Sequence, residues 1–465
     1  MYLDINTILA DGVTVHTANF RKWLEVKLGL TITSTLTDVA IGANTLTVEG
    51  TDGSNVAVGT GAARYLTKTA GQPLQRGMGN TAIGSGALGD AGATCDYITA
   101  VGYQSLNKNT TGYSNTGCGI RTLGNNTTGT YNSAFGVDAL LTNVIGNNNT
   151  AGGAKALLYN TGNNNTAFGT SALQANTSGI ENTAVGPLAG LNQTTASRNT
   201  YTGYRAGDLN ISGTDNTGSG WWSLRSNTGS RNTAHGSAAL LNNGTGTDNT
   251  AIGENAARNN GSGSNVTGLG RNTLVSAITY SNVTGVGANA DVTGSNQVQL
   301  GDSATTTYAY GAVQNRSDIR DKTDINPSTL GLAFINALVP VDYRYDYRED
   351  YRAEGARLGD VVRDGSFARK RRHHGFVAQH VKRATDELGV SFGGFQDHAM
   401  GGGDDVMSLG YTEFIAPMVR AIQDLSEIVF YQQRQIDQIL SKPAPAEIET
   451  LIGAATRALA ARTPI

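Results

Sequence analysis

The five residues Asn165-Thr166-Ala167-Phe168-Gly169 are one copy of a phrase that returns throughout the middle of this chain. Close copies end at Gly84, Gly136, Gly186 and Gly253, and weaker copies fill the intervals between them. The closing glycines lie at positions 84, 102, 119, 136, 153, 169, 186, 203, 220, 236, 253, 270, 287 and 301. Except for the last interval, successive glycines are 16, 17 or 18 residues apart. A fixed period of this length is typical of a repeat architecture.

Each repeat carries two short apolar segments separated by residues that favour turns. One is the quoted phrase, and the other is a small residue followed by leucine, as in Ala139-Leu140 and Ala172-Leu173. Segments this short are adequate for strands but not for helices. Glycine at a constant register predicts positive φ or a close backbone approach. The recurrent asparagine is predicted to bond turn backbone or to stack in a ladder between units.

The repeats offer a thin core, because each supplies little more than one leucine and one Ile, Val or Phe. So little apolar burial does not offset the entropy of ordering about 17 residues. Hydrogen bonds between turns and burial against other chains must contribute. The prediction is a mainly β fold: a fibrous, homotrimeric β-solenoid or β-roll of ~17-residue repeats over residues 71–301. This shaft resembles the repeat heads of trimeric bacterial adhesins and phage tail fibres.

Composition agrees with a fibre and excludes several other classes. The 465 residues include 61 glycines, and only 15 % are charged and 7 % aromatic. A net charge of −3 gives no electrostatic argument for nucleic acid or an anionic membrane. No apolar run is long enough for a membrane span, and the first residues do not read as a signal peptide. Cys95 and Cys118 are interpreted as small buried residues, and no metal or cofactor is expected.

Residues 1–70 differ from the repeat. Residues 17–28 predict a short amphipathic helix, and residues 30–58 alternate as strands do. Two roles fit this segment: a cap that closes the end of the solenoid, or an anchor to other tail or baseplate proteins of a virion. By analogy with tail fibres, whose N-termini usually attach, the anchor is favoured.

After a linker at residues 302–316, the sequence changes character and becomes rich in charge. Four motifs follow in order. They are Ser317-Asp318-x-Arg320-x-Lys322-x-Asp324-Ile325, Val339-Pro340-Val341-Asp342-Tyr343-Arg344-Tyr345, His374-Gly375-Phe376-Val377-Ala378-Gln379, and Leu409-Gly410-Tyr411-Thr412-Glu413-Phe414-Ile415-Ala416-Pro417. Over residues 317–440 this pattern resembles the endosialidase-type intramolecular chaperones, a self-cleaving serine peptidase family at the C-termini of phage tail spikes and fibres. The resemblance implies an α+β chaperone domain at residues 317–465.

The resemblance also implies a single-turnover autopeptidase. Ser317 would be the nucleophile, Lys322 its general base, and Arg316–Ser317 the scissile bond. A serine hydroxyl needs an adjacent base, and a lysine can be that base only when burial or a nearby cation favours its neutral form. Burial during assembly of three chains would meet this condition. The structural alternative is that Ser317 caps a turn and Lys322 is solvated; attack within one chain and attack between chains both remain open.

The C-terminal segment predicts a long coiled-coil helix. Ile415, Ile422, Val429 and Ile436 occupy one heptad position, and Met418, Leu425, Gln432 and Ile439 occupy the other. This mixture is compatible with dimers or trimers. A second short helix is predicted from Ile448 to Ala460.

The aromatic pair Trp221-Trp222 is the candidate receptor site in the shaft. Together with Tyr201 and Tyr204, one repeat earlier, it predicts a sugar-stacking patch. The alternative is that one tryptophan fills the interior while the other packs on the turn.

These observations predict a homotrimeric phage tail fibre, made in the host cytoplasm and carried on the virion. It would bind a polysaccharide or protein receptor on the bacterial surface. The main alternative is a tailspike that depolymerises polysaccharide, which requires paired carboxylates. Asp138, Glu181, Asp208 and Asp248 occur singly in the repeats. A bacterial trimeric autotransporter is disfavoured, since it requires a signal peptide and C-terminal membrane strands.

Overall fold

The computed structural model describes residues 39–43, 55–64, 66, 77–89, 94–276, 279–310, 317–352, 358–401, 406–442 and 446–460. The chain divides into two compact units, Met1–Thr307 and Tyr308–Ile465. The helix predicted at residues 17–28 lies outside the described residues.

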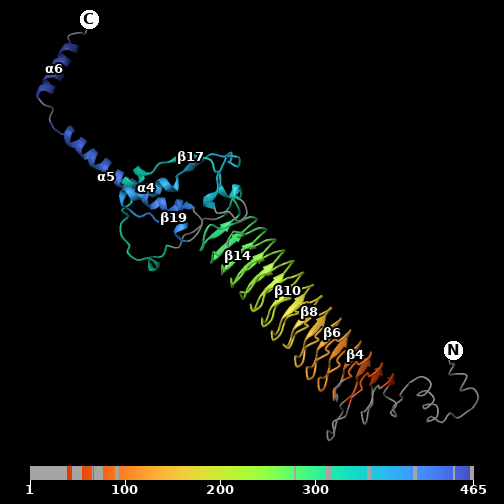
Figure 1. Ribbon diagram of the computed structural model, residues 1–465. Helices are drawn as coiled ribbons and strands as arrows, with labels where there is room; N and C mark the ends of the chain where they lie inside the picture. The colour runs from red at the N-terminus through yellow and green to blue at the C-terminus, as the bar shows by residue number, and fades with distance from the viewer. Residues whose placement is uncertain are drawn as a thin grey trace, which may run out of the picture. The chain divides into compact units, whose positions relative to one another are not determined.

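The first unit is a parallel β-solenoid, as the repeat predicts (Figure 1). Among the described residues, each strand pairs in parallel with the next along the chain, giving one sheet of sixteen strands. The strands are β1 (Val39–Ile41), β2 (Val56–Val58), β3 (Thr81–Ile83), β4 (Thr99–Val101), β5 (Thr116–Cys118), β6 (Ser133–Phe135), β7 (Thr150–Gly152), β8 (Thr166–Phe168), β9 (Thr183–Val185), β10 (Thr200–Thr202), β11 (Thr217–Ser219), β12 (Thr233–His235), β13 (Thr250–Ile252), β14 (Val266–Leu269), β15 (Val283–Val286) and β16 (Val298–Leu300).

The solenoid starts earlier than the predicted boundary at residue 71. β1 and β2 pair in the same register as the later strands, and β2 pairs with β3. Gly42 and Gly59 follow these strands with the same positive φ as the later closing glycines. The segment assigned to residues 1–70 therefore contributes two turns to the shaft, and its role as an anchor stays a prediction.

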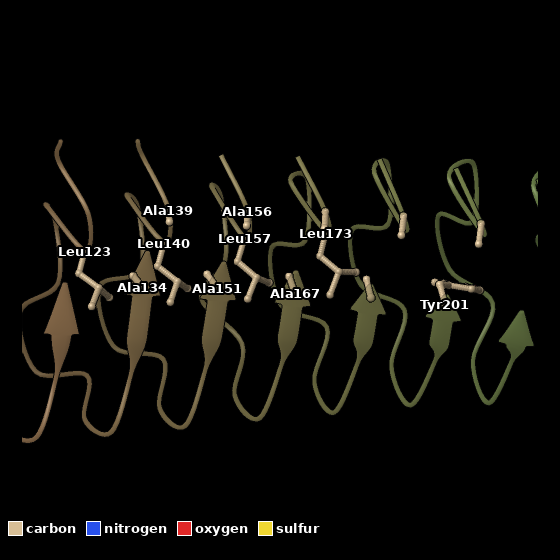
Figure 2. Close-up of a cluster of buried hydrophobic side chains, with 14 of the residues drawn as sticks. Leu123, Ala134, Ala139, Leu140, Ala151, Ala156, Leu157, Ala167, Leu173 and Tyr201 are labelled. Carbon is tan, nitrogen blue, oxygen red and sulfur yellow. The ribbon is translucent and has the colours of Figure 1, made fainter. Parts of the chain in front are cut away.

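The core of the solenoid is a stack of small side chains with one leucine in most turns (Figure 2). The middle residue of each three-residue strand points inward and is usually alanine, such as Ala134, Ala151 and Ala167, all fully buried. Leu140 and Leu157 fill the remaining interior from the turn that follows. Since alternate residues of a strand face opposite sides, the first and third residues of each strand point outward.

The closing glycines are required by the spacing of the turns. From Gly42 to Gly287 they have φ between +108° and +141°, a region that side chains rarely enter. A Cβ atom on Gly169 would lie 2.5 Å from the carbonyl carbon and oxygen of Gly186 in the next turn. Both reasons predicted for a glycine at this register are therefore confirmed.

The predicted asparagine ladder is confirmed, and the described turns contain two such ladders. In the first, the backbone N–H of Asn165 donates to Asn149 Oδ1 at 2.9 Å, and that of Asn182 donates to Asn165 Oδ1 at 3.0 Å. In the second, Asn176 Nδ2 donates to Asn160 Oδ1 at 2.7 Å. These side chains are fully buried, so the ladders supply the hydrogen bonds between turns that a thin core needs.

Asn165→Ala is expected to destabilise the shaft by roughly 2–5 kcal/mol, because each buried polar group left without a partner costs about 1–3 kcal/mol. The substitution removes the acceptor of the Asn182 N–H and the donor to the Gly179 carbonyl. Denaturant unfolding followed by circular dichroism measures the change. Asn192→Ala, at an exposed position of a neighbouring turn, is the control and should leave the transition in place. Equal transitions for both variants would contradict a structural role for the ladder.

The core has a different composition around β10, where it contains an aromatic ring. Tyr201 replaces the usual alanine in β10 and is fully buried, and its hydroxyl accepts from Asn210 Nδ2 at 2.8 Å. Gly190 and Gly207 occupy the leucine positions beside it, and a Cβ on Gly207 would lie 2.3 Å from the tyrosine ring. The assignment of Tyr201 to an exposed sugar-stacking patch is therefore wrong, since its ring replaces two leucines inside the solenoid.

The two cysteines have different environments. Cys95 is fully buried, as predicted, but Cys118 is exposed at the end of β5, so the prediction is wrong for that residue. Burial raises the pKa of the Cys95 thiol from 9.0 to about 12, although a hydrogen bond with Asn109 acts in the opposite direction.

The raised pKa of Cys95 predicts a loss of stability in alkali. A group whose folded pKa is raised contributes stability below its unfolded pKa and loses it as pH rises through the folded value. The thermal midpoint of the shaft should therefore fall between about pH 9 and 12, and Cys95→Ala should flatten that fall. Cys118→Ala is the control, and a fall unchanged by Cys95→Ala would refute the expectation.

The second unit is a small α+β region with a long helix. Its helices and strands are η1 (Ile319–Asp321), α3 (Leu332–Ala337), β17 (Val341–Tyr343), η2 (Arg348–Tyr351), η3 (Leu358–Asp360), β18 (His373–Gly375), α4 (Ala378–Leu388), β19 (Phe395–Asp397), η4 (Ala399–Gly401), β20 (Met407–Leu409), η5 (Tyr411–Phe414), α5 (Ile415–Leu440) and α6 (Ala446–Ala460). Phe334, Val381, Phe392 and Phe414 form its core. The predicted long helix and the short one after it are confirmed as α5 and α6.

Candidate active site

Ser317 and Lys322 lie on either side of a single tight turn. Asp318 caps the three-residue helix η1 by accepting a hydrogen bond from the Arg320 N–H at 2.9 Å. Lys322 ends the helix by donating its own N–H to the Ile319 carbonyl at 3.2 Å. This turn brings the side chains at positions 317 and 322 to the same place.

Lys322 Nζ lies 2.7 Å from Ser317 Oγ, within hydrogen-bonding distance. This is the contact that a serine–lysine dyad requires, because the amine must remove the hydroxyl proton as the oxygen attacks. Both side chains are exposed in the single chain. A lysine acts as a base only when it is neutral, and burial favours that form. The geometry for nucleophile activation is therefore in place within one chain, whereas the burial is not.

The Asp318 carboxylate, which caps η1, also forms an ion pair with Arg320. Arg320 Nη2 lies 2.5 Å from Asp318 Oδ2, and this hydrogen bond holds the pKa of Asp318 below its usual range. Asp318 is consequently ionised at neutral pH and accepts from the turn backbone. This contribution would be lost only as pH falls through the lowered pKa of Asp318. The predicted cleavage position, Arg316, lies outside the described residues.

A second polar pair was not predicted. Asp342 in β17 and His374 in β18 are directly opposite in an antiparallel pair, and His374 Nδ1 lies 2.5 Å from Asp342 Oδ1. Both residues occur in the quoted motifs, but they are 32 residues apart in sequence. Only the pairing of the two strands brings them together.

The comparison with known families places these residues in one domain. Residues 317–390 match the sequence model of the family Peptidase_S74, described as chaperone of endosialidase. This part of the chain is an endosialidase-type chaperone domain. Its match starts at Ser317 and includes Lys322, Asp342 and His374, but it ends before α5 and is shorter than the predicted 317–440. No curated protein matches the chain.

The chaperone domain follows the solenoid in the chain, and the solenoid carries the candidate aromatic patch. Trp221 is 46 % exposed and stacks on Trp222 with ring centroids 3.9 Å apart. Trp222 is partly buried beneath it, with the Arg225 guanidinium 4.9 Å from its ring. Tyr204, in the preceding turn, is 41 % exposed. The patch therefore consists of Trp221 and Tyr204 with Trp222 as support, and without Tyr201.

Two other features are missing from the described parts of the chain. Within them, no group of three or more His, Cys, Asp or Glu side chains is arranged to hold a metal ion. No described helix is both long and apolar enough to cross a membrane.

Proposed function

We propose that this chain is a homotrimeric bacteriophage tail fibre protein that binds a receptor on the host surface. The proposal rests on the endosialidase-type chaperone domain, which begins at Ser317 and follows a β-solenoid shaft in the sequence. Such domains are typical of phage tail fibres and tailspikes. The N-terminal residues would attach the fibre to the virion.

In the proposed cleavage, Ser317 Oγ attacks the carbonyl carbon of Arg316 while Lys322 takes the hydroxyl proton. The carbon–nitrogen bond between residues 316 and 317 breaks, and the departing amine receives a proton. Water then hydrolyses the ester, which leaves the shaft with a new C-terminus at Arg316. The 2.7 Å contact between Lys322 Nζ and Ser317 Oγ supports these roles.

Assembly would control this reaction. Lys322 is exposed in the single chain, so it lacks the burial that a lysine base requires. Burial by neighbouring chains would favour the neutral amine and start the reaction. Cleavage would then follow correct trimer formation.

Light scattering during size-exclusion chromatography tests the assembly. The purified wild-type protein is expected to elute as a trimer of shaft chains. A monodisperse, folded single copy in dilute solution would refute the proposal.

Receptor binding is proposed at the exposed faces of Trp221 and Tyr204, since exposed aromatic faces are common anchors in binding surfaces. Fluorescently labelled shaft can be mixed with a panel of bacterial strains and with capsular polysaccharides on an array. Trp221→Ala should bind at least tenfold more weakly to whichever probe the wild type selects. Tyr159→Ala, which alters an equally exposed ring in an earlier turn, is the matched control.

Polysaccharide depolymerisation is the second candidate, and the carboxylates of the shaft argue against it. Asp138 pairs with Arg121 at 2.8 Å, and Asp248 pairs with Arg231 at 2.6 Å. Asp208 is fully buried and faces two arginines, so no substrate reaches it; burial raises its pKa. New reducing ends after incubation with capsular polysaccharide would favour the depolymerase.

A further inference from the structure

An apolar row runs along the outside of the solenoid at the last residue of its strands. The members that expose more than a third of their surface are Ile41, Ile83, Phe135, Phe168, Val185, Ile252, Leu269, Val286 and Leu300. With strands about 4.8 Å apart, sixteen of them extend this row over roughly 70 Å. Between Val185 and Ile252 the row passes through Thr202, Ser219 and His235, which are polar.

The other outward row of the same sheet has a different chemistry. At the first residue of the three-residue strands from β3 to β13, this row carries threonine, or serine at Ser133. The two rows have the same backbone environment, so strand propensity alone does not explain the difference between them. A long apolar row on a soluble surface marks a place where another surface is bound.

Within the apolar row, one aromatic ring packs against a neighbouring glycine. Phe135 and Phe168 are separated by Gly152, and a Cβ on Gly152 would lie 2.5 Å from the Phe168 ring. The aromatic ring thus lies over the glycine of the preceding turn. At this place in the row the ring therefore covers a position that has no side chain of its own.

A second unpaired apolar surface on the same chain indicates the occupant. Helix α5 buries Pro417 and Ala421, yet its heptad seam is exposed. Ile422, Leu425 and Val429 on that seam are 62 %, 45 % and 61 % exposed. A heptad seam of this kind is covered by equivalent helices from other copies of the chain. The surface that the shaft row needs is available in the same assembly.

We propose that the apolar row is the contact face between three copies of the shaft, packed around a three-fold axis parallel to the solenoid. This inference rests on the proposed trimer and names the face that forms it. Three-fold symmetry puts each residue of the row at the same height as its two equivalents. Phe135, Phe168 and Ile252 would each meet their own copies, and the threonine row would remain at the rim.

A natural cysteine of the chain, Cys118, makes this arrangement testable by cross-linking. Cys118 is the third residue of β5 and is exposed, so the proposed packing gathers three Cys118 thiols near the axis. A short bis-maleimide added to the native trimer should link two chains and leave the third unlinked on a denaturing gel. Cys118→Ala should abolish the linked band. Cys95→Ala should not, because Cys95 is buried in the core of its own chain.

Charge substitution tests the same face independently of thiol chemistry. Ile252→Asp would place three carboxylates at one height on the axis, and we expect loss of the trimer peak or a thermal midpoint lowered by at least 10 °C. Ile145→Asp is the matched control, because Ile145 is 60 % exposed on a turn away from the row. It should leave the trimer and its thermal midpoint unchanged.

The outcomes separate the two proposals. A trimeric wild type that Cys118 does not cross-link, with Ile252→Asp behaving like Ile145→Asp, would overturn the inferred face and leave the trimeric fibre standing. A monomeric wild type would overturn both. Cross-linking through Cys118 together with selective damage by Ile252→Asp would support the face.

Discussion

Ser317→Ala is expected to leave the chain uncut, while the wild type loses residues 317–465, about one third of its 465 residues. The reason is that no other group in the η1 turn lies in the position of Ser317 Oγ, 2.7 Å from the Lys322 amine. Loss of a covalent nucleophile removes the reaction path and does not merely slow it. A denaturing gel of the two purified proteins measures this, and N-terminal sequencing of the released fragment should begin at Ser317.

Two further variants make this test specific. Lys322→Ala should also block cleavage, since the base is lost while the nucleophile remains. Ser328→Ala changes another exposed serine of the same segment and should cleave normally. Cleavage of Ser317→Ala at the wild-type position, or an intact wild type that is already assembled and active, would contradict the proposed dyad.

Ile422→Asp is expected to abolish trimer formation and cleavage together. Ile422 lies on the exposed seam of α5, where a symmetric assembly would bring three introduced carboxylates together. Like charges this close cost several kcal/mol in a desolvated interface. Without assembly Lys322 stays exposed, so the hydroxyl of Ser317 is not activated. Light scattering and a denaturing gel on the same sample measure the two effects.

Gln423→Asp provides the control, because Gln423 is exposed on α5 one position off the seam. It should assemble and cleave like the wild type. If Ile422→Asp remained monomeric but was cleaved at the normal rate, the dyad would be active in a single chain. Assembly would then not control the reaction, although the dyad itself would stand.

The repeat made the solenoid predictable. A glycine that returns about every 17 residues specified the turn length, and its backbone conformation is confirmed at φ +134° for Gly169. Asparagine at a constant register predicted a ladder, because such a side chain satisfies the buried backbone of the next turn. The proposed pairing of Ser317 with Lys322 came from the family resemblance, since a serine and a lysine five residues apart do not by themselves indicate a dyad. The structure adds that one turn brings Lys322 Nζ within 2.7 Å of Ser317 Oγ.

Other features depended on contacts between distant segments. The sequence predicts Tyr201 on the surface, but Gly190 and Gly207 make room for its ring inside the core. Asp342 and His374 form a pair only because β17 and β18 are antiparallel. Cys118 follows the buried Gly117 in β5. Because successive residues of a strand face opposite sides, the Cys118 thiol lies outside the solenoid.

The sequence by itself determined the period and the stacking of the turns, and it predicted a need for partner chains, because each is a property of one repeat copied many times. Only the tertiary structure decided which side chains of a turn face the core and which face the solvent. Whether a side chain faces the core depends on the direction in which it leaves its strand. It also depends on the space that the side chains of the neighbouring turns leave inside the solenoid. The exposed apolar row is the result of that geometry, and no single repeat reveals it.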